Sequence, residues 1–288
     1  MTRRHPWRIT DGLLLAGLLA LAILATRGVW AEIFRIAIRD DEQSHILLAL
    51  PIAAWLAWVR RERLRTVRPR WSIMGPPVVA LGWGLSWFGY SSGVELAMHA
   101  GVIAVVLGVV LTVVGPNVVS RFLPAAMALA FLIPVPGRVR QRIALPMQEI
   151  SAAVTEFGLD IVGVPVARAT NLLTINGQDV VVAEACNGMR MVAALGLITF
   201  AYVFSVPMRN SVRLLILAAS PLVAVVVNVI RLIPTALLYG YSTTTTAEAF
   251  HDWSGWLVLV LAVVILWLIV EALRWIEVPI TPYALGEE

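Results

Sequence analysis

The residues most able to do covalent chemistry lie in residues 180–192, which contain the only cysteine of the chain, Cys186. A thiolate, rather than a thiol, attacks carbonyl carbon, and a cationic neighbour or a helix N-terminus favours the thiolate. Arg190 follows Cys186 by four residues, which places both on one face of a helix. The spacing predicts Cys186 as a nucleophile where a polar segment meets a long apolar run. The alternative is a small cysteine packed in a core.

Two further polar residues stand in or beside apolar runs. Arg231 lies inside a run in which an arginine at mid-bilayer costs ~2.5–3.5 kcal/mol, so its presence suggests a role. We expect it to stabilise a thiolate or an oxyanion, with a snorkelling arginine as the alternative. His251 is a candidate general acid or base because imidazole exchanges protons near neutral pH. Its alternative role is to cap a helix at the membrane surface.

Other polar residues near these three are predicted to support the site. Glu184 could orient a substrate or be a plain interfacial carboxylate, and Asn187, Arg190 and Asn228 complete the supporting set. Ser254 stands within four residues of His251, too close along one helix to form a serine triad with it.

The sequence predicts no metal site and no cofactor. The single cysteine and four dispersed histidines do not form a recognisable metal motif. No phosphate-binding glycine motif is present, and all 22 basic residues are arginine, which excludes a lysine Schiff base.

The composition indicates an integral membrane protein. Of 288 residues, 59% are hydrophobic, and they form runs of about the 20 residues that cross a bilayer. Most arginines lie in short segments between these runs, a pattern that sets topology and does not indicate nucleic-acid binding. We expect an all-α fold in a single polytopic domain, residues 1–288.

The arginine distribution also predicts the orientation in the membrane. Arginines before the first run and in residues 60–70 place both segments in the cytoplasm. About eight spans follow, with both termini cytoplasmic. The expected spans are residues 13–26, 44–59, 71–90, 94–114, 122–132, 187–206, 214–239 and 250–270.

Residues 138–185 form the longest polar interval, predicted to be an extracytoplasmic interfacial insertion. Apolar residues at spacings of four and three indicate an amphipathic helix in the interface plane. They are Ile143, Met147, Ile150, Val154, Phe157 and Ile161. Asn176-Gly177 between β-branched runs then predicts a small β-hairpin that leads to Cys186.

This topology brings the three candidate residues to one side of the membrane. Cys186 and His251 each open a span from outside. Arg231 follows the cytoplasmic Arg213 by 18 residues, or ~27 Å of helix, and so approaches the outer surface.

Three short blocks together resemble the exosortase/archaeosortase family of multi-span membrane cysteine transpeptidases. They are Cys186-x-Gly188-x-Arg190, Asn228-x-x-Arg231 and His251-x-x-x-Gly255, with weaker similarity at residues 41–45 and 133–136. Asn187 replaces a common serine and Met191 a small polar residue, changes that concern the subfamily and its substrate motif.

The resemblance implies that Cys186 is the nucleophile, Arg231 the electrostatic stabiliser and His251 the proton-transfer group. The implied substrates are exported proteins with a C-terminal sorting signal: a short motif such as Pro-Glu-Pro, a transmembrane helix and a basic tail. The enzyme would cleave it at the outer face of a bacterial inner membrane and pass the protein to an acceptor, for which a lipid-linked molecule is a candidate. The alternative is a non-catalytic transporter or exopolysaccharide export factor, with Arg231 and His251 lining a polar pathway.

Overall fold

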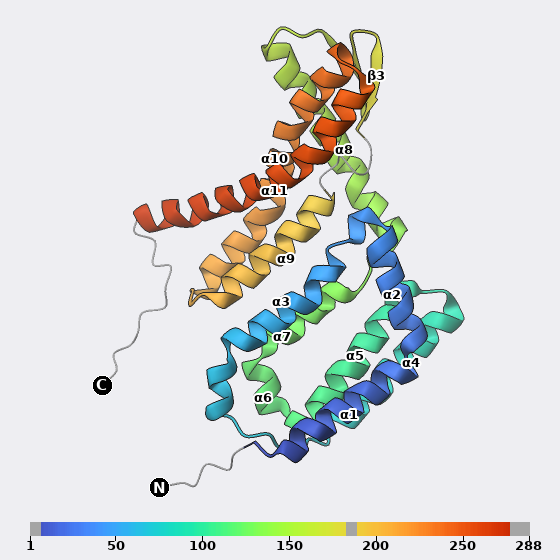
Figure 1. Ribbon diagram of the computed structural model, residues 1–288, viewed down its shortest axis with the longest axis vertical. Coiled ribbons are helices and arrows are strands. Elements are labelled where there is room, and N and C mark those ends of the chain that lie inside the picture. Colours follow the sequence, from blue (N-terminus) through green and yellow to red (C-terminus); the bar gives the residue numbers. More distant parts are fainter. Residues whose placement is uncertain (1–6, 183–188, 277–288) are drawn as a thin grey trace. The chain divides into compact units, whose positions relative to one another are not determined.

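The computed structural model describes residues 7–182 and 189–276, and the chain divides into two compact units. Unit 1 is Met1–Pro136 and unit 2 is Gly137–Glu288. Helices dominate both units, and a small sheet lies in unit 2 (Figure 1). The expectation of a single polytopic domain stays a prediction.

Unit 1 consists of helices and short 3₁₀ turns. They are α1 (Ile9–Ala25), α2 (Arg27–Arg39), η1 (Asp41–Gln43), α3 (Ile46–Val59), η2 (Arg61–Arg65), α4 (Gly75–Ser92), α5 (Glu95–Val114), α6 (Pro116–Arg121), α7 (Leu123–Ala128) and η3 (Leu129–Leu132). Helices α4 and α5 pack most closely, because a Cβ on Gly82 would lie 2.7 Å from the backbone nitrogen of Val105. Gly93, at φ +68°, ends α4 in the left-handed conformation.

Helix α2 lies between the first two expected spans, residues 13–26 and 44–59, where no helix was predicted. It continues α1 after a bend of 78° at Thr26, whose hydroxyl donates to the carbonyl of Ala22 at 2.7 Å. Ile33 and Ala37 are buried on one face, so packing inside unit 1 stabilises the helix.

A hydrogen bond joins the two weakly similar blocks of unit 1. The backbone N–H of Val135 donates to Oε1 of the buried Gln43 at 2.8 Å, across 92 residues of sequence. Gln43 also donates from Nε2 to Asp40 at 3.2 Å. The turn before α3 is therefore fixed against the segment that leaves η3.

Unit 2 combines an amphipathic helix, a three-stranded sheet and three apolar helices. They are α8 (Gly137–Ile161), β1 (Val166–Ala169), β2 (Leu172–Ile175), β3 (Gln178–Val181), α9 (Met189–Ser205), α10 (Asn210–Tyr241) and α11 (Thr244–Trp275). Helices α9, α10 and α11 share a core that includes Leu195, Val227 and Ala262.

The predicted hairpin is confirmed and is extended by one strand. Asn176 and Gly177 have φ of +52° and +75°, and a two-residue type I′ turn requires positive φ at both central residues. Strand β1 adds to β2, giving an antiparallel order β1-β2-β3. Nδ2 of Asn176 donates to the carbonyl of Gly240 at 3.1 Å, so the hairpin is fixed to the C-terminal end of α10.

Helix α8 is also confirmed, and it turns its apolar stripe away from the protein. Ile150, Phe157 and Ile161 are 55%, 66% and 71% exposed, whereas Gln148 and Ser151 are buried. An apolar face left outward suits contact with lipid. Its position in the interface plane stays a prediction.

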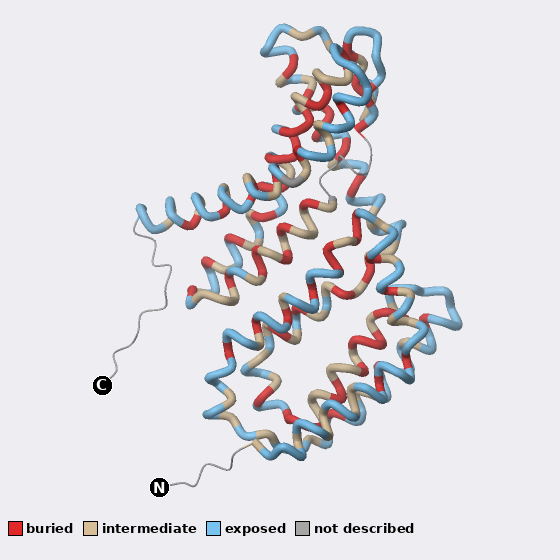
Figure 2. The backbone as a smooth tube through the Cα atoms, in the orientation of Figure 1, coloured by how far each residue is buried: buried red, intermediate tan, exposed pale blue. Residues whose placement is uncertain are grey.

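The eight expected spans are all largely helical where the structure describes them, but eight crossings are not confirmed. Three helices in the described region, α5, α10 and α11, are long and apolar enough to cross a membrane, or up to five if two bent pairs each count as one span. Helices α3 and α9, with 14 and 17 residues, are shorter than the ~20 residues that a perpendicular span needs. Figure 2 shows α11 largely exposed, as a lipid-facing helix is.

Candidate active site

Arg231 is the centre of a polar cluster that α10 and α11 build together. Its side chain is buried, with 8% of the residue exposed. Nε donates to Oγ of Ser254 at 3.1 Å, and Nη2 donates to the backbone carbonyl of His251 at 2.9 Å. A Cβ on Gly255 would lie 3.9 Å from Nη2, so the guanidinium passes close to the backbone of α11. An arginine in an apolar helix thus has its partners on the neighbouring helix.

Further hydrogen bonds within α10 and within α11 surround this cluster. The hydroxyl of Ser254 donates to the carbonyl of His251 at 3.1 Å, so this carbonyl accepts two bonds. On α10, the hydroxyl of Thr235 donates to the carbonyl of Arg231 at 2.8 Å. Asn228, one turn before Arg231, is fully buried on the same helix. Both atoms that accept from the guanidinium are therefore themselves joined by a hydrogen bond on α11.

His251 lies at the edge of the cluster, between opposite charges. Its side chain is 23% exposed, and Nδ1 is 3.3 Å from Oδ1 of the exposed Asp252. The positive charges of Arg231 and Arg190 act on the same imidazole. The ring is therefore partly open to solvent and close to both a carboxylate and guanidinium groups, which suits a proton-transfer group.

Arg190 brings the first turn of α9 into this neighbourhood. The residue is half-buried, and its positive charge interacts electrostatically with the imidazole of His251. Helices α9, α10 and α11 thus each contribute a charged or titratable side chain. The structure confirms no catalytic role for them, but it brings Arg190, Arg231 and His251 of the predicted set together.

Glu184, Cys186 and Asn187 lie outside the described residues, so their predicted roles stay predictions. The described residues on either side of them are near the cluster. Val182 belongs to the same hydrophobic cluster as Leu232, the neighbour of Arg231, and Met191 belongs to the cluster that includes Val227 of α10. The chain therefore leaves the sheet and begins α9 beside this part of α10.

Sequence reasoning missed the function of Ser254 as a partner of Arg231. It considered this serine only as a nucleophile, whereas its hydroxyl contacts the carbonyl and not the imidazole of His251. A serine three residues after His251 in an apolar helix could have indicated a hydrogen-bonding partner for a buried arginine. Residues 7–182 and 189–276 contain no group of three or more acidic, His or Cys side chains arranged for a metal ion.

Comparison with known families agrees with this arrangement. The family model described as transmembrane exosortase matches residues 30–268, a stretch that includes Arg190, Arg231 and His251. The chain belongs to the transmembrane exosortase family. Neither the curated proteins nor the solved structures gave a match. For this exosortase, the resemblance seen in the sequence is confirmed, and membership agrees with helices α5, α10 and α11, which are long and apolar enough to cross a membrane.

Proposed function

We propose that this exosortase is a membrane cysteine transpeptidase that cleaves the C-terminal sorting signal of exported proteins and transfers them to an acceptor. The observation that carries the proposal is the fixed guanidinium of Arg231, bonded to Ser254 and to the carbonyl of His251. A preorganised cation is effective where negative charge develops in a transition state, because it needs no reorganisation when the charge appears.

Each residue has one role in the proposed reaction. The thiolate of Cys186 attacks the scissile carbonyl carbon, and Arg231 stabilises the resulting oxyanion. His251 gives a proton to the departing amine, which leaves with the transmembrane helix and its basic tail. The thioester is then attacked by the acceptor nucleophile, whose proton passes to His251. The thiolate is regenerated and the cycle closes with no net proton change.

The proposed site lies at the extracytoplasmic end of α10. Arg209 and Arg213 stand at the opposite end of this helix, which the positive-inside rule assigns to the cytoplasm. Eighteen residues separate Arg213 from Arg231, or ~27 Å along a helix, nearly the thickness of the hydrocarbon core. A substrate with its own transmembrane helix would reach such a site by lateral diffusion.

The decisive experiment is to express the chain with tailed candidate substrates and to search for a thioester on Cys186 by mass spectrometry. We expect an adduct with the mass of the cleaved substrate, removable by hydroxylamine. Cys186→Ala should abolish both adduct and cleavage while the protein still inserts in the membrane.

The same variant separates the enzyme from a transporter or an export factor. A transporter that uses Arg231 and His251 as a polar pathway would barely respond to loss of the thiol. Substrate cleavage by Cys186→Ala at the wild-type rate would therefore reject the proposed chemistry.

A further inference from the structure

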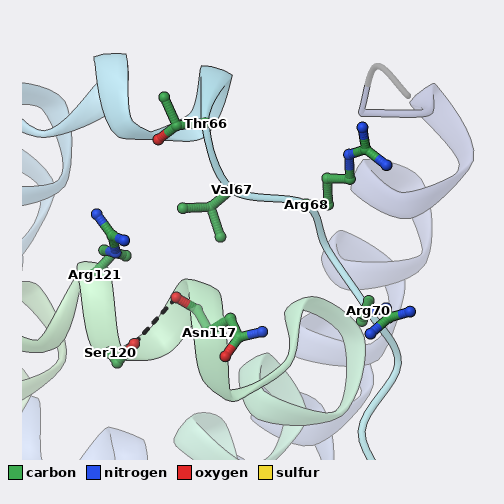
Figure 3. A pocket seen from close by; sticks show the side chains of 7 residues that line it. All are labelled: Thr66, Val67, Arg68, Arg70, Asn117, Ser120 and Arg121. Atoms are coloured by element: carbon green, nitrogen blue, oxygen red, sulfur yellow. Dashed lines mark hydrogen bonds between the residues drawn. The ribbon is translucent and has the colours of Figure 1, made fainter. Parts of the chain in front are cut away.

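Unit 1 contains a basic cavity that the proposed reaction does not use. Its volume is about 500 Å³, within the ~300–1,000 Å³ of small-molecule sites. Figure 3 shows it between the extended segment 66–70 and helix α6. The polar residues that line it are Thr66, Arg68, Arg70, Asn117, Ser120 and Arg121. Three of its seven lining residues are arginine and none is acidic, so the cavity suits an anion.

The walls of this cavity are fixed to the end of a membrane-spanning helix. The N–H of Arg70 donates to the carbonyl of Val114 at 3.3 Å, where α5 ends. Gly115 follows at φ +79°, and a side chain there would overlap the carbonyl of Arg70. Nη1 of Arg63 donates to the carbonyl of Arg121 at 3.0 Å and ties η2 to α6. The segment and α6 are thus joined around the C-terminus of α5.

Exposed apolar residues place the cavity at the depth of lipid headgroups. Directly after Arg70, the residues Trp71, Ile73 and Met74 are 71%, 89% and 63% exposed. Tryptophan is enriched where a membrane meets water, and exposed apolar side chains beside a spanning helix face lipid. These apolar residues do not line the cavity, but they directly follow Arg70, which does.

The positive charge of residues 60–70 also favours an anionic lipid headgroup as the ligand. Residues 60–70 contain six arginines and one acidic residue, Glu62, which pairs with Arg65 at 2.8 Å. Arginine binds phosphate through two parallel N–H donors, and basic pockets at the ends of spanning helices bind anionic headgroups.

We propose that this cavity binds the phosphate of an anionic phospholipid, in the leaflet on the side of residues 60–70. The topology predicted from the arginines makes this the cytoplasmic leaflet. An acidic peptide could pair with the arginines but would not cover the exposed apolar residues that follow Arg70. A free phosphate would likewise make no contact with those apolar residues. The site is separate from Arg231 and requires no cleavage activity.

The test is native mass spectrometry of the full chain in detergent, titrated with phosphatidylglycerol or with phosphatidylcholine. The wild-type chain should retain phosphatidylglycerol more strongly than phosphatidylcholine. Arg70→Gln combined with Arg121→Gln should weaken retention about 25-fold, since each arginine near a phosphate contributes about fivefold to binding. The corresponding lysine pair should keep most of the affinity, which shows that the chain still folds.

A matched control removes two charges from the same segment outside the cavity. Arg61→Gln combined with Arg65→Gln should keep phosphatidylglycerol within about threefold of wild type, because neither residue lines the cavity. Equal loss in both glutamine pairs would mean a diffuse positive field and would overturn the proposal. So would displacement of the lipid by millimolar inorganic phosphate, or tighter retention of an acidic peptide than of the lipid.

Discussion

Replacement of Arg231 by lysine tests whether the geometry of the guanidinium, rather than its charge, matters. Arg231 uses two different nitrogens, Nε for Ser254 and Nη2 for the carbonyl of His251. A lysine ammonium is one point charge on a flexible stem, so it cannot occupy both positions at once. Arg231→Lys therefore loses at least one hydrogen bond from a charged donor in a buried place.

The expected size of the effect follows from that loss. A hydrogen bond to a charged group contributes ~1.5–3 kcal/mol. If this bond holds the guanidinium in position for the transition state, kcat/KM for cleavage falls about 10- to 150-fold, at about 1.4 kcal/mol per tenfold. The assay is the rate of processing of a tailed substrate in membrane vesicles, normalised to the amount of folded enzyme.

The control for this prediction lies on the same helix. Arg213 also donates from several nitrogens, Nε to the carbonyl of Val203 and Nη1 to Asn210 at 3.0 Å, and Nη2 to the carbonyl of Val206 at 3.4 Å. Arg213→Lys should lower the unfolding temperature but leave the processing rate per folded molecule unchanged. Wild-type turnover by Arg231→Lys would refute the reasoning, because a diffuse positive charge would then be sufficient.

Three other changes test the site and the fold. Ser254→Ala removes the acceptor for Nε of Arg231 and should slow processing about 10- to 150-fold in the same assay, and an unchanged rate would contradict the positioning role of this hydroxyl. Gly240→Ala places a Cβ 2.6 Å from Cγ2 of Ile175 and should lower the free energy of unfolding by about 1–3 kcal/mol, whereas Gly196→Ala, with no atom within 4 Å, should not lower it in a detergent melt. Gln43→Leu leaves the N–H of Val135 without its acceptor and should cost about 1–3 kcal/mol by the same measurement, against less than about 0.5 kcal/mol for Gln178→Leu at an exposed position.

Elements that produce a pattern among neighbouring residues could be predicted from the sequence. The apolar spacing that starts at Ile143 predicted α8, and Asn176-Gly177 predicted the turn between β2 and β3. In both cases the signal spans a few neighbouring residues, so no distant contact is needed to read it.

The elements that were missed carry no strong local signal. Helix α2 is stabilised by Ile33 and Ala37, which pack inside unit 1, and these contacts with distant residues cannot be read from a local window of sequence. Strand β1 pairs with a close neighbour, since Ala169 lies opposite Leu172. The turn between them, Thr170-Asn171, lacks the Asn-Gly pair that predicted the turn between β2 and β3.

The number of membrane crossings also could not be predicted from the sequence alone. Hydrophobicity identified eight apolar segments, but a span also needs length and a straight path. Bends of 78° after α1 and of 91° before α8 interrupt the helices, the second at Pro134-Val135-Pro136, so apolar runs and crossings need not be equal in number.

In the candidate site, the unusual residues could be recognised from the order of residues along the chain. An arginine inside an apolar helix is costly wherever the fold places it, so Arg231 could be singled out from its surroundings in the chain. The tertiary structure alone decided what that arginine bonds to, because Ser254 and the carbonyl of His251 come from a different helix, 20 or more residues away. The cavity between residues 66–70 and α6 likewise exists only because the end of α5 holds two distant basic segments together.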